Sequence, residues 1–253
     1  MESALFTNIR DTLDAHYDRR ERLNKLSRDI TQLGKKLIFH LLRITPSSRD
    51  RILAEAEKKH EEIRRLIGQL GPDLQGSDRY RYAGTVTGGL QEYIEALALW
   101  RFLEAGRLVT VAEVEARING LEPPTSSTEI GAEKDAEDGV GASVAPPSQP
   151  LAVLPEDYVL GIADVAGELM RYAINSLAKG QRDEAIRVCD FFRQFYNEFS
   201  LIDVKLHKQM SKKVEVMKES LAKVENVQLQ ISEFPNSTRA PTFDFDAPVA
   251  AGE

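Results

Sequence analysis

The spacing of proline is the feature that most constrains the fold of this chain. The eleven prolines leave three long stretches without proline, at residues 1–45, 73–122 and 156–234. Proline inside a helix costs about 3 kcal/mol, so these stretches can form long helices, and the prolines between them mark helix ends. Within the stretches the apolar residues recur three and four positions apart. That period is typical of amphipathic helices.

The pattern predicts seven helices. They are expected over residues 1–44, 48–70, 82–105, 111–119, 155–178, 182–199 and 204–231. The fourth should open on a capping box, because Thr110 is followed three positions later by Glu113. No run alternates apolar and polar residues over a useful length, so no strand is expected. We therefore predict an all-α protein, a seven-helix bundle of long antiparallel helices.

The composition divides the chain into four segments. Residues 121–154 contain five prolines, many Ser, Ala, Gly and acidic residues, and no aromatic side chain. Such a segment cannot bury enough apolar surface to offset its chain entropy, so a disordered connector is predicted. Residues 1–120 and 155–232 should be the N-terminal and C-terminal helices of one bundle. Residues 233–253 should form a flexible tail.

The charge balance restricts the classes of function. With 33 Lys and Arg against 40 Asp and Glu, the net charge is −7. A stand-alone, non-specific nucleic-acid binder usually has a basic excess, so a nucleic-acid role needs a local basic strip, a metal or a partner. The single cysteine cannot form an internal disulfide, and no apolar run reaches the roughly 18 residues of a membrane span. We expect a cytoplasmic or nuclear protein with no membrane association.

The helices predicted over residues 82–105 and 155–178 carry very few charged residues. Within 85–103 and 158–178 the charged side chains are Glu92, Glu95, Arg101, Asp164, Glu168 and Arg171. A surface helix of this length would have a whole polar face, so both should be central helices. Their acids therefore face a second packed surface or a cavity.

Two explanations for these acids remain open. Glu92 and Glu95 share one face of their helix, and Asp164 and Glu168 share one face of theirs, with Cβ atoms about 5–6 Å apart. Burying unpaired carboxylates costs several kcal/mol, so something must offset that cost. One explanation is pairing with arginine. The other is Mg²⁺ or Mn²⁺, which prefers carboxylate and water oxygens and would support hydrolysis of a phosphodiester.

Five segments, in this order along the chain, resemble the translin-associated factor X family, the partners of translin. They are Leu26–Thr31 (LSRDIT), Gly89–Ala96 (GLQEYIEA), Asp157–Asp164 (DYVLGIAD), Gly167–Arg171 (GELMR) and Ser220–Asn226 (SLAKVEN). The resemblance covers about residues 10–232. One departure is Gly88, where the family pattern has threonine before glycine. The connector at 121–154 has no clear counterpart in the family.

The resemblance implies a fold, an activity and a set of partners. It implies a seven-helix α-bundle that assembles with translin into a hollow hetero-oligomer, expected to be an octameric shell. This complex is expected to cleave single-stranded RNA as a metal-dependent endoribonuclease. The substrates implied are small-RNA strands and tRNA-precursor fragments, with single-stranded DNA as a further ligand and both cytoplasm and nucleus as compartments. The family's catalytic and metal-binding acids fall on Glu92, Glu95, Asp164 and Glu168, with Mg²⁺ or Mn²⁺ as the ion.

The expected reaction is attack by a metal-activated water on the RNA phosphodiester, leaving 5′-phosphate and 3′-hydroxyl ends. Six basic residues are candidates for holding phosphates: Arg19, Arg22, Lys25, Lys35, Lys36 and Arg43. Acidic residues are interleaved with the first three, so a solvated, salt-bridged face is the favoured alternative there. The rival function is a non-catalytic subunit that stabilises translin and helps to bind single-stranded nucleic acid.

A histidine motif suggests a third possibility. Glu57 and His60 have the Glu-x-x-His spacing of a di-iron bundle, but such a site needs a second copy and further glutamates. Only one copy exists, and it lies in a strongly charged run, Ala-Glu-Lys-Lys-His-Glu-Glu. We therefore predict that His60 is a surface residue.

Overall fold

The computed structural model describes residues 2–121, 150–202 and 208–233, and in these residues every long element is a helix. The helices are α1 (Glu2–Leu41), α2 (Arg49–Gly68), α3 (Asp78–Ala105), α4 (Val111–Asn119), α5 (Pro155–Ala178), α6 (Arg182–Phe199) and α7 (Lys208–Glu233), with short 3-10 turns at Pro46–Ser48 and Gly71–Asp73. No strand occurs in the described part of the chain. The predicted all-α, seven-helix fold is confirmed.

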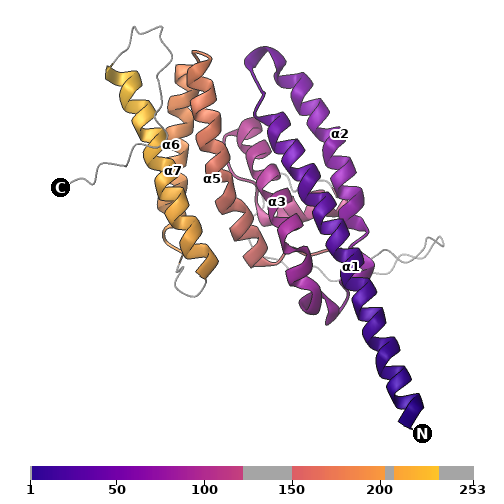
Figure 1. Ribbon diagram of the computed structural model, residues 1–253. Coiled ribbons are helices and arrows are strands. Elements are labelled where there is room, and N and C mark those ends of the chain that lie inside the picture. Colours follow the sequence, from indigo (N-terminus) through magenta and orange to yellow (C-terminus); the bar gives the residue numbers. More distant parts are fainter. Residues whose placement is uncertain (1, 122–149, 203–207, 234–253) are drawn as a thin grey trace, which may run out of the picture.

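Helices α3 and α5 occupy the middle of the bundle (Figure 1). Helix α3 packs on α1 and α5, while α5 packs on α6 and α7, and α2 lies against α1 and α4. The N-terminal part of α1 extends beyond the other helices (Figure 1). Apolar side chains on this projecting part are exposed: Leu5, Phe6, Ile9, Leu13 and Tyr17. Helix α3 reaches this part at His16, which hydrogen-bonds the Tyr82 hydroxyl, while the apolar side chains from Leu5 to Leu13 stay exposed.

Helix α3 is buried on opposite faces, as its low charge predicted. Val86, Leu90 and Tyr93 are buried on one side, and Leu99 and Phe102 on another. All belong to one continuous hydrophobic core. Burial of each such side chain contributes about 1.5–3 kcal/mol, so α3 is held from several directions at once. Any polar group on α3 is consequently placed with little freedom.

Two glycines let the central helices approach closely. A Cβ at Gly89 of α3 would lie 2.8 Å from the carbonyl oxygen of Ser27 on α1. A Cβ at Gly161 of α5 would lie 2.8 Å from the carbonyl oxygen of Gln91 on α3. Only glycine fits such backbone contacts. Gly88, in contrast, would meet nothing within 4 Å, so the glycine that departs from the family pattern serves no close contact.

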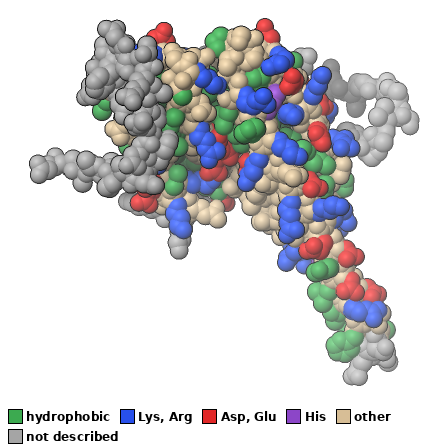
Figure 2. Space-filling view, turned by 45° about the horizontal axis from the view of Figure 1, so that its top comes forward, with side chains coloured by type: hydrophobic (Ala, Val, Ile, Leu, Met, Phe, Trp, Pro, Cys, Tyr) green, Lys and Arg blue, Asp and Glu red, His purple; other side chains and the backbone are tan. Residues whose placement is uncertain are grey.

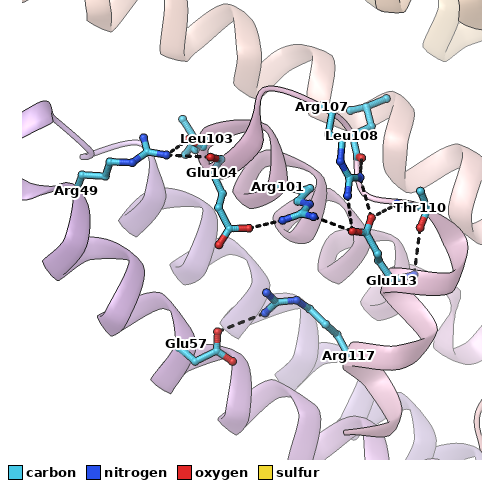
Figure 3. A network of polar contacts seen from close by, with 10 residues as sticks. All are labelled: Arg49, Glu57, Arg101, Leu103, Glu104, Arg107, Leu108, Thr110, Glu113 and Arg117. Carbon is cyan, nitrogen blue, oxygen red and sulfur yellow. Dashed lines mark hydrogen bonds and ion pairs between the residues drawn. The ribbon is translucent and has the colours of Figure 1, made fainter. Parts of the chain in front are cut away.

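The helix ends agree with the predictions in most places. The capping box of α4 is present: Glu113 N–H donates to Thr110 Oγ1 at 3.2 Å, and Thr110 N–H donates to Glu113 Oε2 at 2.8 Å (Figure 3). Helix α3 begins at Asp78, four residues before the predicted Tyr82. An ion pair from Arg19 of α1 holds Asp78, and this contact between distant residues extends the helix. Helix α1 ends at Leu41, three residues before the predicted end at residue 44.

Parts of two predicted segments lie outside the described residues. The connector predicted at 121–154 is described only at its ends, and of the tail predicted at 233–253 only residue 233 is described. The last residues before α5 pack against α4. The N–H of Leu151 donates to Asn119 Oδ1 at 2.9 Å, and the N–H of Val153 donates to Glu115 Oε1 at 2.9 Å. These residues fix the start of α5 relative to α4.

Candidate functional site

The four acids predicted as a site lie on the two central helices. Glu92 and Glu95 project from α3, and Asp164 and Glu168 from α5, which packs on α3 through Gly161. Glu168 is buried, and the other three are partly buried. We call these four residues the acidic cluster. Their positions follow from the helical spacing that the sequence predicted, together with one close helix contact.

The acidic cluster perturbs its own ionisation. Burial raises the pKa of Glu95 to about 8, and the negative charges of Asp164, Glu92 and Glu168 add to the effect. Burial also raises the pKa of Glu92, although Lys35 partly opposes this. For Glu168 burial again raises the pKa, and Arg171 opposes it. Ionised carboxylates close together in a poorly hydrated place disfavour one another, so the cluster favours any added positive charge.

Among the residues that the structure describes, three basic side chains contact the acidic cluster. Arg171 Nη1 lies 3.0 Å from Glu168 Oε1 within α5, and Lys35 Nζ of α1 lies 3.9 Å from Glu92 Oε2. Lys213 of α7 donates to a carboxylate oxygen of Asp164. Arginine pairing, the first of the two explanations that the sequence left open, therefore applies to Glu168 through Arg171.

The second available arginine does not serve the acidic cluster. Arg101 is directed to Glu104 at 2.7 Å and to Glu113 at 3.0 Å (Figure 3). Arg107 also pairs with Glu113, at 2.6 Å. These contacts hold α4 against the end of α3. Arginine pairing therefore leaves part of the charge of the acidic cluster unopposed.

Some carboxylate oxygens of the acidic cluster have no hydrogen-bond or ion-pair partner among the described residues. Among the described residues, no hydrogen bond or ion pair reaches the Glu95 carboxylate, while each of the other three acids has one basic partner. If all four carboxylates are ionised, as binding of a metal ion would require, the three basic groups leave one negative charge. Glu168 Oε2 is also buried, and no described residue forms a hydrogen bond with it. A buried oxygen without a partner is costly, and a bound cation would relieve that cost.

The donor atoms of the cluster suit a hard divalent cation. All four residues offer carboxylate oxygens, the ligands that Mg²⁺ and Mn²⁺ prefer. In the described part of the chain, however, no three of the four acids have ligand atoms that all lie within 4.8 Å of one another. The group that meets this distance is Glu57, His60 and Glu61 on α2. The chemistry of the cluster fits the ion, while its carboxylates stand further apart than in a closed cage.

The six basic residues proposed for phosphate binding fall into two groups. Arg22 makes two bonds to Asp73, at 2.8 and 2.6 Å, and Arg19 pairs with Asp73 and Asp78. Arg19 and Arg22 therefore belong to a salt-bridged face, which was the alternative to phosphate binding. The side chains of Lys25, Lys35, Lys36 and Arg43 are exposed. Figure 2 shows Lys and Arg side chains spread over the visible face of the bundle.

Sequence reasoning missed two residues beside this site. Lys213 contacts Asp164 from 49 positions away, and no local pattern in α7 could have identified that contact. Phe39 is 69% exposed on α1, which also carries Lys35 and Lys36, and Arg43 follows in the turn after α1 ends at Leu41. The sequence did contain a sign of this residue. Phe39 is an aromatic residue flanked by basic ones, at a position where the helical period does not require a core residue.

The prediction for His60 was wrong. His60 is only 3% exposed, although the residues around it are charged. Its ring stacks on Tyr93 at a centroid distance of 5.9 Å and meets the edge of Trp100 at 6.0 Å. The helical period turns position 60 toward α3, and the aromatic residues of α3 accept a ring there. Burial consequently lowers the pKa of His60.

The fold and the site define an all-α bundle protein with a cluster of acids between its two central helices. The chain belongs to the translin family, whose sequence profile matches residues 18–232. It is 38% identical over 250 residues to Translin-associated protein X of Pongo abelii, covering 94% of this chain and 82% of that protein. It is 23% identical over 234 residues to Translin of Gallus gallus, covering 91% and 92%.

Solved structures share the fold. Apo-NeC3PO superposes with a TM-score of 0.66 and 20% identity, over 89% of this chain and 96% of that one. AfC3PO in complex with duplex RNA superposes with a TM-score of 0.60 and 20% sequence identity. The match covers 92% of this chain and 99% of that one. These structural similarities confirm the predicted architecture, and the family profile together with the 38% identity to Translin-associated protein X confirms the predicted family. Among the described helices, none is both long and apolar enough to cross a lipid bilayer.

Proposed function

We propose that this chain is the catalytic subunit of a complex with translin that cleaves single-stranded RNA with Mg²⁺ or Mn²⁺. The observation that carries the proposal is Glu95, a largely buried carboxylate with no basic partner, beside three other acids. A scaffold has no need of this arrangement, because an apolar residue at the same position would be more stable. Membership of the family and the RNA-bound relative of the same fold support the same conclusion.

The acidic cluster would hold the metal ion. Glu92, Glu95, Asp164 and Glu168 are the proposed ligands, and the ion when bound would activate water and stabilise charge on the phosphate. Arg171 orients Glu168, and Lys213 orients Asp164, through the contacts described above. Glu168 is buried and Glu92 and Glu95 are partly buried, which reduces the competition of bulk water for these carboxylates, whereas the Asp164 side chain is 39% exposed. The protein therefore contributes placement and charge, the two requirements of phosphodiester hydrolysis.

A strip on α1 is the proposed path of the RNA strand toward the cluster. Lys35 lies beside Glu92, and Phe39 follows one turn later on the same face of α1. Arg43 lies in the turn two residues beyond the end of α1 at Leu41. Basic groups bind the backbone and an exposed aromatic ring stacks on a base, which is how single strands are held without sequence preference. This arrangement predicts weak sequence preference and noticeable salt dependence.

The projecting part of α1 is the proposed contact with translin. Its exposed apolar residues include Leu5, Ile9 and Leu13, spaced four apart on one helical face. Figure 2 shows hydrophobic side chains on this part of the molecule. A helical face of this kind is normally covered by a partner. The net charge of −7 also fits a subunit that receives further phosphate contacts from its partner.

The experiment that tests the proposed function uses the chain coexpressed with translin. RNA cleavage is measured with Mg²⁺ and with EDTA for the wild type and for Glu168→Gln. We expect cleavage only by the wild type with metal. Glu104→Gln, on α3 but outside the cluster, is the matched control and should cleave normally. Equal cleavage by wild type and Glu168→Gln would exclude the metal mechanism.

The alternative function is a non-catalytic subunit that stabilises translin and helps to bind single-stranded RNA or DNA. It is favoured by the basic strip alone, which needs no metal. Under this alternative neither the wild-type complex nor the Glu168→Gln complex cleaves RNA. The wild-type chain would still raise the affinity of the complex for single strands. Cell fractionation would test the proposed cytoplasmic and nuclear location, and sequencing of RNA bound to the complex would test small-RNA and tRNA-precursor substrates.

A further inference from the structure

A second group of metal-ligating side chains lies on α2. Glu57, His60 and Glu61 occupy positions i, i+3 and i+4, so they share one face, and their ligand atoms all lie within 4.8 Å of one another. His60 Nδ1 is 3.4 Å from Glu57 Oε1 and 3.8 Å from Glu61 Oε1. We call these residues the α2 triad. None of them belongs to the acidic cluster of α3 and α5.

The histidine of the α2 triad is buried with unsatisfied ring nitrogens. His60 is 3% exposed, and neither ring nitrogen makes a hydrogen bond within the described part of the chain. The hydroxyl of Tyr93 and the indole N–H of Trp100, the two rings that enclose His60, are also buried without partners. Buried polar atoms are almost always satisfied in native proteins, so an exception needs an explanation, such as a bound ion or water. His60 Nδ1 faces the two carboxylates and would be satisfied by an ion held between them.

The surroundings of the triad leave the necessary oxygens available. Arg117 of α4 contacts Glu57 through Oε2 at 3.3 Å (Figure 3). The other oxygen, Oε1, is the one that lies 3.4 Å from His60 Nδ1. Arg64 makes its shortest contact with Glu61 through Oε2, at 2.6 Å, while its Nε also reaches Oε1 at 3.2 Å. Ligating carboxylates are commonly hydrogen-bonded in this way by a second layer of residues. The arginines can therefore orient the ligands, at the cost of some repulsion toward the ion.

The chemistry of the triad distinguishes between metals. One imidazole nitrogen and two carboxylate oxygens suit Zn²⁺, whereas Mg²⁺ prefers oxygen ligands alone. The Glu57 and Glu61 side chains are each 51% exposed, so an ion can enter from solvent between them. Three protein ligands leave a position open for water. The pKa of His60 is lowered by burial, which keeps the ring neutral and able to ligate near neutral pH.

We propose that Glu57, His60 and Glu61 bind one Zn²⁺ ion, and that this ion strengthens the contact of α2 with α3 and α4. His60 reaches the aromatic residues of α3, and Arg117 of α4 reaches Glu57, so an ion at the triad lies where the three helices meet. The site is independent of the acidic cluster and of RNA cleavage. The triad does not fit the di-iron site considered from the sequence, because the described residues supply no second histidine to this group.

The test titrates the full-length chain with Zn²⁺ against a chelating indicator, in excess Mg²⁺ to occupy sites made of carboxylates alone. The wild type should bind one Zn²⁺ per chain and gain thermal stability. Glu57→Gln and Glu61→Gln, both on half-exposed side chains, should each weaken binding at least about tenfold. The matched control is Glu55→Gln on the same helix. Glu55 lies 3.4 Å from His40 but has no third ligand, so its variant should bind Zn²⁺ like the wild type.

A second readout follows the histidine directly. Zn²⁺ should shift the ring signals of His60 in NMR spectra and leave those of His40 unchanged. This measurement keeps the proposal testable if His60→Gln fails to fold. Absence of Zn²⁺ binding by the wild type would overturn the proposal. So would equal binding by Glu57→Gln, Glu61→Gln and wild type, or a loss of binding in Glu168→Gln, which would place the ion in the acidic cluster.

Discussion

Replacing Gly161 with alanine should destabilise the protein through the contact of α3 with α5. The new Cβ would lie 2.8 Å from the carbonyl oxygen of Gln91 and 2.8 Å from the Cβ of Ile94. Neither atom is the end of a flexible side chain, so the helices must separate. Such overpacking costs about 1–3 kcal/mol. Alanine returns about 0.5–1 kcal/mol of helix propensity, so the net loss spans about 0–2.5 kcal/mol, and we expect a value near the middle of that range, about 1 kcal/mol.

Gly167 provides the matched control in the same helix. A Cβ there would meet nothing within 4 Å, so Gly167→Ala should stabilise the protein by about 0.4–1 kcal/mol. Urea unfolding of both variants measures the difference. Gly161→Ala should also reduce RNA cleavage by the translin complex, because the separating helices carry the acids. If Gly161→Ala were as stable as Gly167→Ala, the reasoning about close helix contact would be refuted.

Three further predictions concern helix α4, RNA binding and assembly. The Arg107 guanidinium lowers the pKa of Glu113 to about 2. The contribution of the Arg107–Glu113 contact to the free energy of unfolding is therefore fully present above about pH 4.5 and is lost as the pH falls toward 2. Glu113→Gln should lower the urea midpoint more at pH 7 than at pH 3, and an equal effect at both would contradict this. Phe39→Ala should weaken RNA binding by the complex about fivefold or more, since stacking contributes about 1–3 kcal/mol per base. Tyr80→Ala, at another exposed ring, should have no such effect, and equal losses would contradict base stacking. Leu13→Glu should reduce assembly with translin in size-exclusion chromatography, and an unchanged profile would remove the projecting part of α1 from the interface.

Elements set by local rules were predictable from the sequence. Helix α5 runs from Pro155 to Ala178 as expected, because a proline suits the first turn of a helix and Gly180 follows its end. The Thr110 capping box is also local, since both partners lie within one turn. The low charge of α3 and α5 predicted their central place, because a helix covered on several sides cannot carry a polar face.

Features that depend on residues far apart in sequence were not predictable. His60 is buried because the aromatic rings of α3 meet it, and a charged stretch gives no sign of that contact. Lys213 reaches Asp164 from another helix, and Arg101 turns to Glu113 instead of the acidic cluster. Periodicity places residues on a face of a helix. It does not decide which of several charged neighbours that face will meet.

Direct measurement of Mn²⁺ binding tests the central claim most sharply. Calorimetric titration of the translin complex would compare the wild type with Glu95→Gln, which keeps the shape of the side chain and removes its charge. Glu104→Gln, paired with Arg101 outside the cluster, serves as the control. We predict that Mn²⁺ binding by this subunit is lost in Glu95→Gln and kept in Glu104→Gln. Undiminished binding by Glu95→Gln would contradict the assignment of the acidic cluster as the metal site.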